Sequence, residues 1–314
     1  MEVKDKILML APMAGVTDAA FRSVCARFGA ARTVTEMVSA KAVCFGDRKT
    51  GLIAEPYEGE HCVIQIFGSE PSYMAKAAEK LMRYAPAGID INMGCPVPKC
   101  VKNGEGSALM KNPVLCGEIV AAVCSAVDVP VSVKMRTGFD SAHKNAVEVA
   151  LRAEEAGASL ICVHGRTREQ MYAGDAEAET AAEVKRAVSV PVIVNGDIKD
   201  GESALKALAC TGCDGVAVGR AALGCPWIFA EISAALNGLP YTEPSPLERY
   251  GVFCEHIRAM EKIKGSRLAA LESRKHLAWY SKGLRGSASI RRSANTVSTV
   301  SGALELAKKI FGIE

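Results

Sequence analysis

Cys95 stands in the segment "DINMGCPVPKC", where an apolar run gives way to Asn, Gly and Cys and then to prolines. A thiol has a reference pKa of about 8.5, so it is largely protonated near neutral pH yet able to donate its proton. Pro96 and Pro98 stiffen the chain that follows. The segment therefore predicts a rigid loop that presents Cys95 as a general acid, with Cys100 as the weaker alternative.

Two later segments have the residue types of an anion-binding site. "VIVNGDI" and "VAVGRAALG" each place a glycine after an apolar run, at Gly196 and Gly219, and Arg220 follows the second glycine. Glycine lets backbone N–H groups approach an anion closely, and a helix N-terminus nearby adds its positive end. We expect a phosphate group here, because a turn role alone does not explain the pair of loops.

Gln65 and Lys134 also follow β-branched runs. An amide offers a donor and an acceptor to a ring edge, and a lysine stabilises negative charge on a heterocycle, so the pair matches the pyrimidine edge of a reduced flavin. Gln65 alternatively caps a strand end, and Lys134 alternatively forms a Schiff base in an aldolase. His164 is the only one of five histidines at an expected strand end, which favours a site role.

The elements that position these residues follow from the apolar pattern. Eight β-branched runs begin at residues 7, 33, 61, 88, 131, 160, 191 and 215. Helical periodicity lies between them, for example over 71–85 and over 141–158, where Gly157 ends the helix. This alternation predicts a (β/α)8 TIM barrel. Because a barrel's active site lies at the C-terminal ends of its strands, the polar residues after each run should meet.

Composition agrees with a folded enzyme. The chain has 314 residues, 49% of them hydrophobic, which allows a large core. No run is long enough for a membrane span, and the N-terminus lacks a signal-peptide pattern, so we expect a cytoplasmic protein. The twelve cysteines predict free thiols in a reducing compartment. The only CxxC, at Cys210 and Cys213, lacks a second pair, and we expect no metal.

Charge is distributed unevenly along the chain. Residues 1–242 hold 25 Lys and Arg against 28 Asp and Glu, a net charge of −3, whereas residues 243–314 hold 13 against 7, or +6. A Pro-, Gly- and Ser-rich segment, residues 237–246, separates the strand pattern from helices without strands. We therefore expect a catalytic barrel over 1–238 and a basic helical domain over 239–314 that faces a polyanion.

The ordered motifs resemble those of the tRNA-dihydrouridine synthases. The resemblance spans residues 7 to 232, and "NMGCP" followed by "GSALM" is its most specific part. The segment "RKHLAWYSKGLRGSASIRR" is similar to the helical RNA-binding domain of that family. The other segments that carry the resemblance are "LAPMAGVTDAAFR", "TEMVSA", "VIQIFGSEP", "VKMRTGFD", "VHGRTREQMYAGDA", "IVNGDI" and "VAVGRAALGCPWIF".

This resemblance implies an FMN-dependent reduction of the C5–C6 double bond of D-loop uridines in tRNA, with NADPH as electron donor and 5,6-dihydrouridine as product. The flavin N5 would deliver hydride to C6, and Cys95 would protonate C5. We expect a monomer. Carried over by motif position, the cofactor residues are Pro12, Met13, Ala14, Gln65, Asn92, Lys134, His164, Asn195, Gly196, Asp197, Gly219 and Arg220.

Basic residues are the expected contacts of tRNA phosphates. Arg136, Arg166 and Arg168 would stand at the rim of the barrel. The helical domain would add Lys275, Lys282, Arg285, Arg291 and Arg292.

Three other functions compete with this one. An FMN-dependent barrel oxidoreductase acting on a small pyrimidine explains the cofactor residues but not the basic helical segment. An RNA-binding protein with a vestigial barrel predicts eroded cofactor positions, and these are intact. Aldolase or phosphosugar chemistry, the third, predicts a protein without bound flavin.

Overall fold

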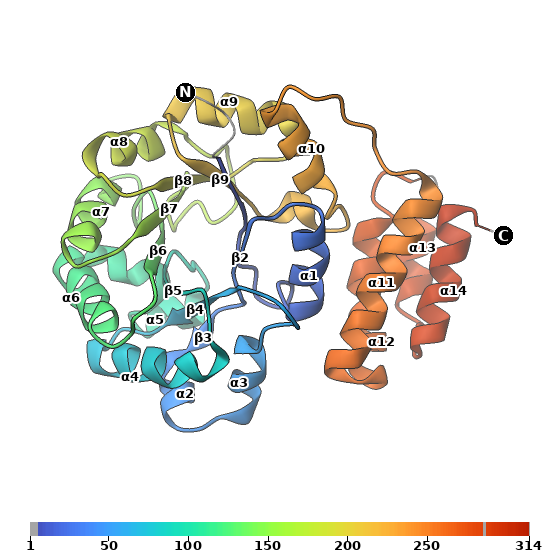
Figure 1. The fold of residues 1–314 in the computed structure, drawn as a ribbon, viewed down its shortest axis with the longest axis horizontal. Coiled ribbons are helices and arrows are strands. Elements are labelled where there is room, and N and C mark those ends of the chain that lie inside the picture. The colour runs from blue at the N-terminus through green and yellow to red at the C-terminus, as the bar shows by residue number, and fades with distance from the viewer. Residues whose placement is uncertain (1–5, 285–286, 314) are drawn as a thin grey trace.

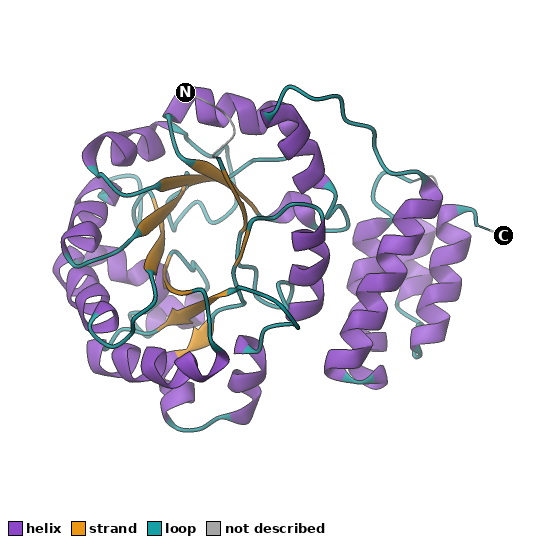
Figure 2. Ribbon diagram, in the orientation of Figure 1, coloured by secondary structure: helices purple, strands orange, loops and turns teal. Residues whose placement is uncertain are grey.

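The computed structural model describes residues 6–284 and 287–313. Parallel strands form a ring surrounded by helices, and a second group of helices stands beside that ring (Figures 1 and 2). The strands are β1 (Ile7–Leu10), β2 (Arg32–Thr33), β3 (Val38–Ser39), β4 (Val63–Phe67), β5 (Gly88–Met93), β6 (Val131–Arg136), β7 (Leu160–His164), β8 (Val192–Asn195) and β9 (Gly215–Val218).

All strand pairs are parallel, in the order β2-β1-β9-β8-β7-β6-β5-β4-β3. The two ends of this sheet are joined by one chain segment, because Val34 directly follows β2 and forms a parallel bridge with Val63 of β4. The sheet is therefore closed, and the predicted TIM barrel with C-terminal helices is confirmed.

Helices connect the strands of the ring and continue beyond it. In the ring they are α1 (Ala19–Arg27), α2 (Ala40–Cys44), α3 (Arg48–Ala54), α4 (Pro71–Leu81), α5 (Pro98–Lys102), α6 (Pro113–Cys124), α7 (Ala146–Glu155), α8 (Glu179–Ala187), α9 (Gly201–Thr211) and α10 (Ile228–Leu236). Short 3-10 helices are η2 (Met82–Tyr84), η3 (Gly106–Lys111) and η4 (Arg220–Ala222). The last part has α11 (Pro246–Lys264), α12 (Ser266–Tyr280), α13 (Ser287–Ala294) and α14 (Val300–Phe311).

Two predicted elements differ from the structure. The second strand, expected from residue 33, is split into β2 and β3, because after Val34 the Thr35 hydroxyl donates to the Glu36 carbonyl and the chain leaves the sheet. The helix expected over 141–158 begins only at Ala146. The residues before it form a tight turn instead, with an antiparallel bridge between Gly138 and Lys144.

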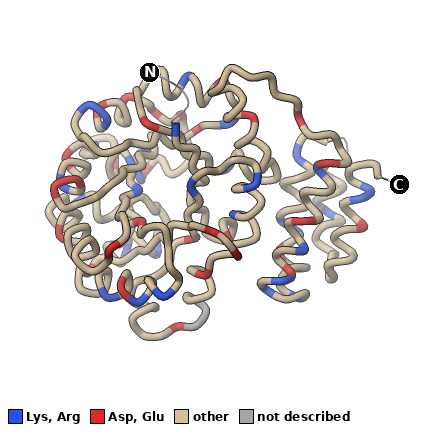
Figure 3. Tube along the Cα trace, viewed as in Figure 1, with Lys and Arg blue, Asp and Glu red and all other residues tan. Residues whose placement is uncertain are grey.

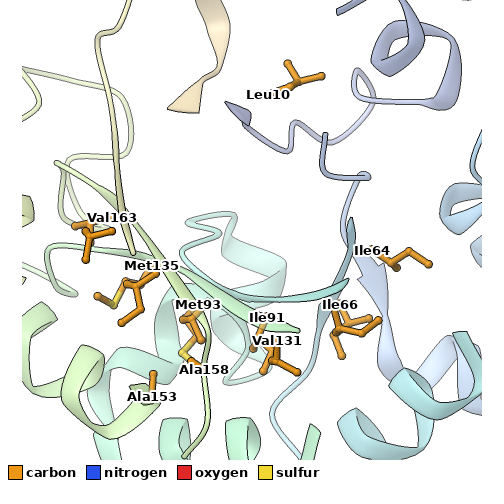
Figure 4. Packing of buried hydrophobic residues seen from close by; sticks show 14 of the residues in the cluster. Leu10, Ile64, Ile66, Ile91, Met93, Val131, Met135, Ala153, Ala158 and Val163 are labelled. Carbon is orange, nitrogen blue, oxygen red and sulfur yellow. The ribbon is translucent and has the colours of Figure 1, made fainter. Parts of the chain in front are cut away.

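The side chains of each strand alternate between two cores. Outward positions pack against the surrounding helices (Figure 4), among them Leu10, Ile64, Ile66, Ile91, Met93, Met135 and Val163. Inward positions fill the barrel with a smaller apolar cluster that includes Met9, Val63, Cys162 and Ile193. Because side chains alternate with a period of two, the polar residues between the outward positions must point into the barrel. This alternation puts Gln65, Asn92, Lys134, His164 and Asn195 on the inner face.

The last helices pack on α1 of the ring. One apolar cluster joins Ala20 and Val24 of α1 and Trp227 to buried residues of α11, α12 and α14. Arg27 of α1 pairs with Glu255 of α11 at 3.0 Å. Lys, Arg, Asp and Glu are interleaved on these helices (Figure 3). None of the helices in the described part of the chain is long and apolar enough to cross a membrane.

Candidate active site

A pocket of about 1050 Å³ opens at the C-terminal ends of the strands. This is the end at which barrel enzymes place their active sites. It gathers Cys95 and all twelve residues expected at a cofactor, together with three of the expected tRNA contacts, Arg136, Arg166 and Lys282. The barrel topology thus brings residues from the ends of seven strands, β1 and β4 to β9, to one site, as the alternation pattern requires.

The loop that carries Cys95 is held by hydrogen bonds that Asn92 and Ser107 make with its backbone. The Asn92 side-chain oxygen accepts from the backbone N–H groups of Gly94 (3.1 Å) and Cys95 (2.9 Å). Ser107 donates its backbone N–H (3.1 Å) and its hydroxyl (2.8 Å) to the Cys95 carbonyl. Gly106, at φ +60°, lies so close that a Cβ would be 2.8 Å from that carbonyl. These contacts fix the backbone of the loop at Cys95.

Cys95 and Cys100 differ in their access to the pocket. The Cys95 side chain is partly exposed and lines the pocket, whereas Cys100 is buried in α5 and does not. Burial, with a smaller contribution from Cys95, raises the pKa of Cys100 to about 12. A thiol with so high a pKa is a poor proton donor at neutral pH, so the geometry favours Cys95 over Cys100.

A chain of amides links the Cys95 loop to a buried carboxylate. Asn92 donates to the Gln65 side-chain oxygen at 2.8 Å, and Gln65 donates to Asp90 at 2.7 Å. Ser132 also donates to Asp90 at 2.6 Å. Burial raises the pKa of Asp90, and the hydrogen bonds from Gln65 and Ser132 oppose part of that rise. The sequence interpretation overlooked Asp90, although a carboxylate inside an apolar strand signals a buried network.

Lys134 is aimed into the pocket by Asn195. Its ammonium donates to the Asn195 side-chain oxygen at 3.0 Å, and the Asn195 amide nitrogen donates to the Ala217 carbonyl at 2.7 Å. Both polar atoms of Asn195 are thus used within the protein, so its side chain orients Lys134 and leaves the lysine's other two N–H donors for a bound molecule.

His164 is neutral in this site. Burial, together with the positive charges of the nearby Lys134, Arg136, Arg166 and Arg220, lowers its pKa to about 2. Six cationic side chains line the pocket against two carboxylates, those of Asp175 and Asp197; the cations are Lys134, Arg136, Arg166, Lys199, Arg220 and Lys282. This surplus of positive charge favours an anionic ligand.

Asp197 organises the side of the pocket where the sequence predicts a phosphate. It accepts from Arg166 at 2.7 Å, from the Ala176 backbone N–H at 2.8 Å and from Arg220 at 3.4 Å. Burial raises its pKa, but the hydrogen bonds from Arg166 and Ala176 and the nearby charges bring the net pKa below its usual value. Its carboxylate therefore fixes the two arginines, and a direct contact with a phosphate would be repulsive.

The two glycines of this side have different roles. At Gly196, which has φ +118°, a Cβ would lie 2.6 Å from the Ala176 Cβ, so the protein itself requires glycine. At Gly219 a Cβ would meet no atom closer than 3.9 Å and would project into the pocket. Gly219 thus leaves open the space that an anion would occupy next to its backbone.

The structure corrects the predicted rim position of two arginines. Arg136 and Arg166 are each only 2% exposed. Arg136 donates to the carbonyls of Gly94, Thr167 and Met171 at 2.7 to 2.9 Å, and Arg166 is bound to Asp197. They are buried because they join the loops after β5, β7 and β8, so neither is a surface contact for tRNA.

The other expected tRNA residues lie in several places. Arg168 is outside the pocket, with its guanidinium carbon 5.3 Å from the centre of the Phe139 ring. Lys275 contacts the β1–α1 loop instead of open solvent. Arg292 is exposed on α13. Arg285 and the side chain of Arg291 lie outside the described residues.

Tyr172 is a pocket residue that the sequence interpretation missed. It is 53% exposed and lies between two cations, with its ring centre 4.9 Å from the Arg220 guanidinium carbon and 5.8 Å from that of Arg136. An aromatic residue within the quoted segment "VHGRTREQMYAGDA" was the available signal. The arrangement provides an exposed ring face at the edge of a cationic pocket.

A family model described as dihydrouridine synthase matches residues 9–312, which include every residue of this pocket. The chain belongs to the dihydrouridine synthase family. This confirms the family expected from the motifs, and it extends the match through the last helices.

Named relatives of this dihydrouridine synthase belong to the same family. A tRNA-dihydrouridine synthase B of Pseudomonas aeruginosa is 43% identical, over 92% of this chain and 87% of that protein. One of Pseudomonas putida is 45% identical, over 87% and 82%, and one of Vibrio vulnificus is 41% identical, over 99% and 97%. The crystal structure of TcOYE with pHBA has a TM-score of 0.51 at 13% identity, covering 78% of this chain and 92% of that chain, and shows a shared barrel fold.

Proposed function

We propose that this protein is a tRNA-dihydrouridine synthase that binds FMN and uses NADPH to reduce the C5–C6 double bond of D-loop uridines in tRNA. Family membership and the names of relatives over 40% identical support this activity. The observation that carries it is the position of Cys95, a partly exposed thiol on a fixed loop of the same pocket that holds the cation cluster.

The residues of the pocket fit a flavin mononucleotide. Its volume of about 1050 Å³ is at the upper end of small-molecule sites, which allows a cofactor and a nucleobase together. Pro12, Met13 and Ala14 provide an apolar wall for a flat ring. The open backbone at Gly219, beside Arg220 and the surplus of positive charge, suits the phosphate of FMN over a neutral flavin.

We assign roles to the side chains that face this ligand. Gln65 keeps one N–H and one oxygen lone pair for the ring edge, since its other contacts go to Asp90 and Asn92. Lys134 stabilises negative charge on the ring. His164 remains neutral, so it can donate one hydrogen bond and accept another without adding charge. The bound flavin supplies the two-electron chemistry, and NADPH replenishes it.

Cys95 is the proton donor in this proposal. Its thiol gives a proton to C5 of the uracil, and the thiolate is reprotonated from solvent through the open pocket. The fixed loop keeps the sulfur at one side of the bound base, which sets the face that is protonated. Asn92 acts indirectly, because its amide is occupied in holding the Cys95 and Gly94 backbone.

The first experiment tests cofactor and activity together. The purified protein is expected to be yellow with an FMN spectrum that NADPH bleaches, and to form dihydrouridine in tRNA from a strain that lacks the enzyme. Mass spectrometry of digested tRNA measures the product. Reduction of free uridine with no change in tRNA would instead favour an oxidoreductase acting on a small pyrimidine, and absence of flavin would contradict the cofactor assignment.

We assign tRNA binding to residues 239–314, with the protein acting as a cytoplasmic monomer. Lys282, just after α12, reaches the same pocket as Cys95. This joins the basic segment to the entrance through which a uridine must pass. A uridine has to leave its stack to enter, at a cost of a few kcal/mol, and phosphate contacts on these helices offset that cost.

Replacing Arg291 and Arg292 together by alanine is expected to weaken tRNA binding and to lower the slope of log K against log salt by about one for each lost phosphate contact. Binding titrations at several salt concentrations measure both effects. The matched control replaces Arg186 and Lys206, two exposed residues of α8 and α9, by alanine. Equal salt slopes in the two variants would contradict a role for α13.

A further inference from the structure

Lys275 does not project from α12 towards solvent, as a tRNA contact would. Its ammonium donates to the backbone carbonyl of Gly15 at 2.6 Å, across 260 positions of sequence, and its side chain is 32% exposed. Gly15 belongs to the loop between β1 and α1, directly after the pocket residues Pro12, Met13 and Ala14. A helix of the last segment therefore holds the apex of a loop that forms one wall of the pocket.

The same residue of the loop is held from the barrel side through its other backbone group. The Gly15 backbone N–H donates to the Glu36 carboxylate, and the residue adopts φ +74°. Burial raises the pKa of Glu36, and the hydrogen bond from Gly15 opposes part of that rise. The loop also has an internal turn, in which Val16 and Thr17 donate to the Met13 carbonyl at 3.0 Å. The tip of this loop is therefore held by two side chains, that of Glu36 from the barrel and that of Lys275 from α12.

A second contact holds the other end of this loop. Lys264, in the last turn of α11, pairs with Asp18 at 2.5 Å, and Asp18 caps the N-terminus of α1. Burial alone would raise the pKa of Asp18, but Lys264 and the hydrogen bond from Phe21 hold it below its usual value. Glu272 of α12 joins the two lysines, accepting from Lys264 at 2.7 Å and from Lys275 at 3.2 Å.

We propose that Lys275 is a positioning residue for the cofactor pocket, and that through it the helical segment sets how firmly the flavin is held. The inference rests on the proposed FMN-dependent function. Its basis is geometric: without the ammonium, the Gly15 carbonyl loses its hydrogen bond to the last helices. The tip of the loop beside Pro12, Met13 and Ala14 is then held through the Gly15 N–H and Glu36, and Lys264 holds only the far end of the loop at Asp18.

The decisive experiment measures flavin retention in the full-length holoenzyme. Lys275→Met is expected to release FMN about fivefold to twentyfold faster on dilution, since a hydrogen bond from a charged group is lost at a partly exposed position. The fluorescence of free FMN follows the release. Lys262→Met is the matched control, because Lys262 is an exposed lysine in the last turn of α11. It should release FMN at the wild-type rate.

Further measurements separate positioning from general damage and from tRNA binding. Lys275→Arg should restore slow release because it keeps a cationic donor, and thermal unfolding of the apoproteins should be alike in all variants. Unchanged FMN release in Lys275→Met would overturn the proposal. The proposal would also be overturned if Lys275→Met lost more tRNA affinity than Lys262→Met while its flavin retention stayed unchanged. Absence of flavin from the wild type would instead contradict the proposed function itself.

Discussion

Cys95→Ala is expected to retain bound flavin and its reduction by NADPH while losing about 10² to 10⁴-fold of the rate of tRNA reduction. The loss follows because the proposed reaction takes its proton from the Cys95 thiol, and alanine has no proton to donate. The loop should persist, since Asn92, Ser107 and Arg136 hold backbone atoms, not the sulfur. Stopped-flow flavin reduction and a single-turnover dihydrouridine assay measure the two steps separately.

The matched control is Cys210→Ala, which removes an exposed thiol on α9 that is not a pocket residue. This variant should be fully active. Cys100→Ala distinguishes the two thiols of the "GCPVPKC" segment and should keep most of the activity, because Cys100 is buried outside the pocket. Full tRNA reduction by Cys95→Ala would remove the acid role from this residue.

Arg166→Met is expected to yield a protein with little bound flavin and a free energy of unfolding lowered by about 2–3 kcal/mol. The change leaves Asp197 with the Ala176 N–H and the longer contact to Arg220, beside the expected phosphate position. The estimate is below that for fully buried pairs because the Asp197 side chain is 39% exposed. Denaturant titration and the flavin-to-protein absorbance ratio measure these effects.

Arg186→Met provides the comparison for Arg166→Met. Arg186 also pairs with a carboxylate, that of Glu179 at 3.0 Å, but both side chains are largely exposed. Such a pair contributes less than about 1 kcal/mol, so flavin content and stability should stay near wild type. If Arg166→Met retains full flavin occupancy, the Arg166–Asp197 pair does not organise the phosphate side.

Much of the fold was predictable from local pattern. Parallel barrel strands are buried on both faces, so apolar runs such as "VSVKM" stand out against the helical windows. One exception lies between Val34 and Val38, where the strand propensity of the sequence continues. There the Thr35 hydroxyl donates to the Glu36 carbonyl and accepts from the Gln65 backbone N–H, and the chain leaves the sheet. The late start of α7 at Ala146 is a second exception. There the turn is stabilised by Asp140, which accepts from the backbone N–H of His143 at 2.9 Å.

The pocket was predictable as a set, because strand ends meet in a barrel and each polar residue could be placed by its strand. Individual contacts were not. Arg136 and Arg166 appear from sequence to be exposed loop cations, and their burial depends on carbonyls and a carboxylate supplied by other loops. Lys275 meets Gly15 only through the packing of α12 near α1, a contact between residues far apart in sequence.

The apolar cluster that α1 shares with α11, α12 and α14 has a practical consequence for protein engineering. A barrel truncated near residue 238 would expose Ala20, Val24 and Trp227 to water. It would therefore be a poor substitute for the whole protein in experiments. An exchange of the last helices for those of a relative could be used to change which uridine is reduced. Such an exchange would also require the matching residues on the face of α1.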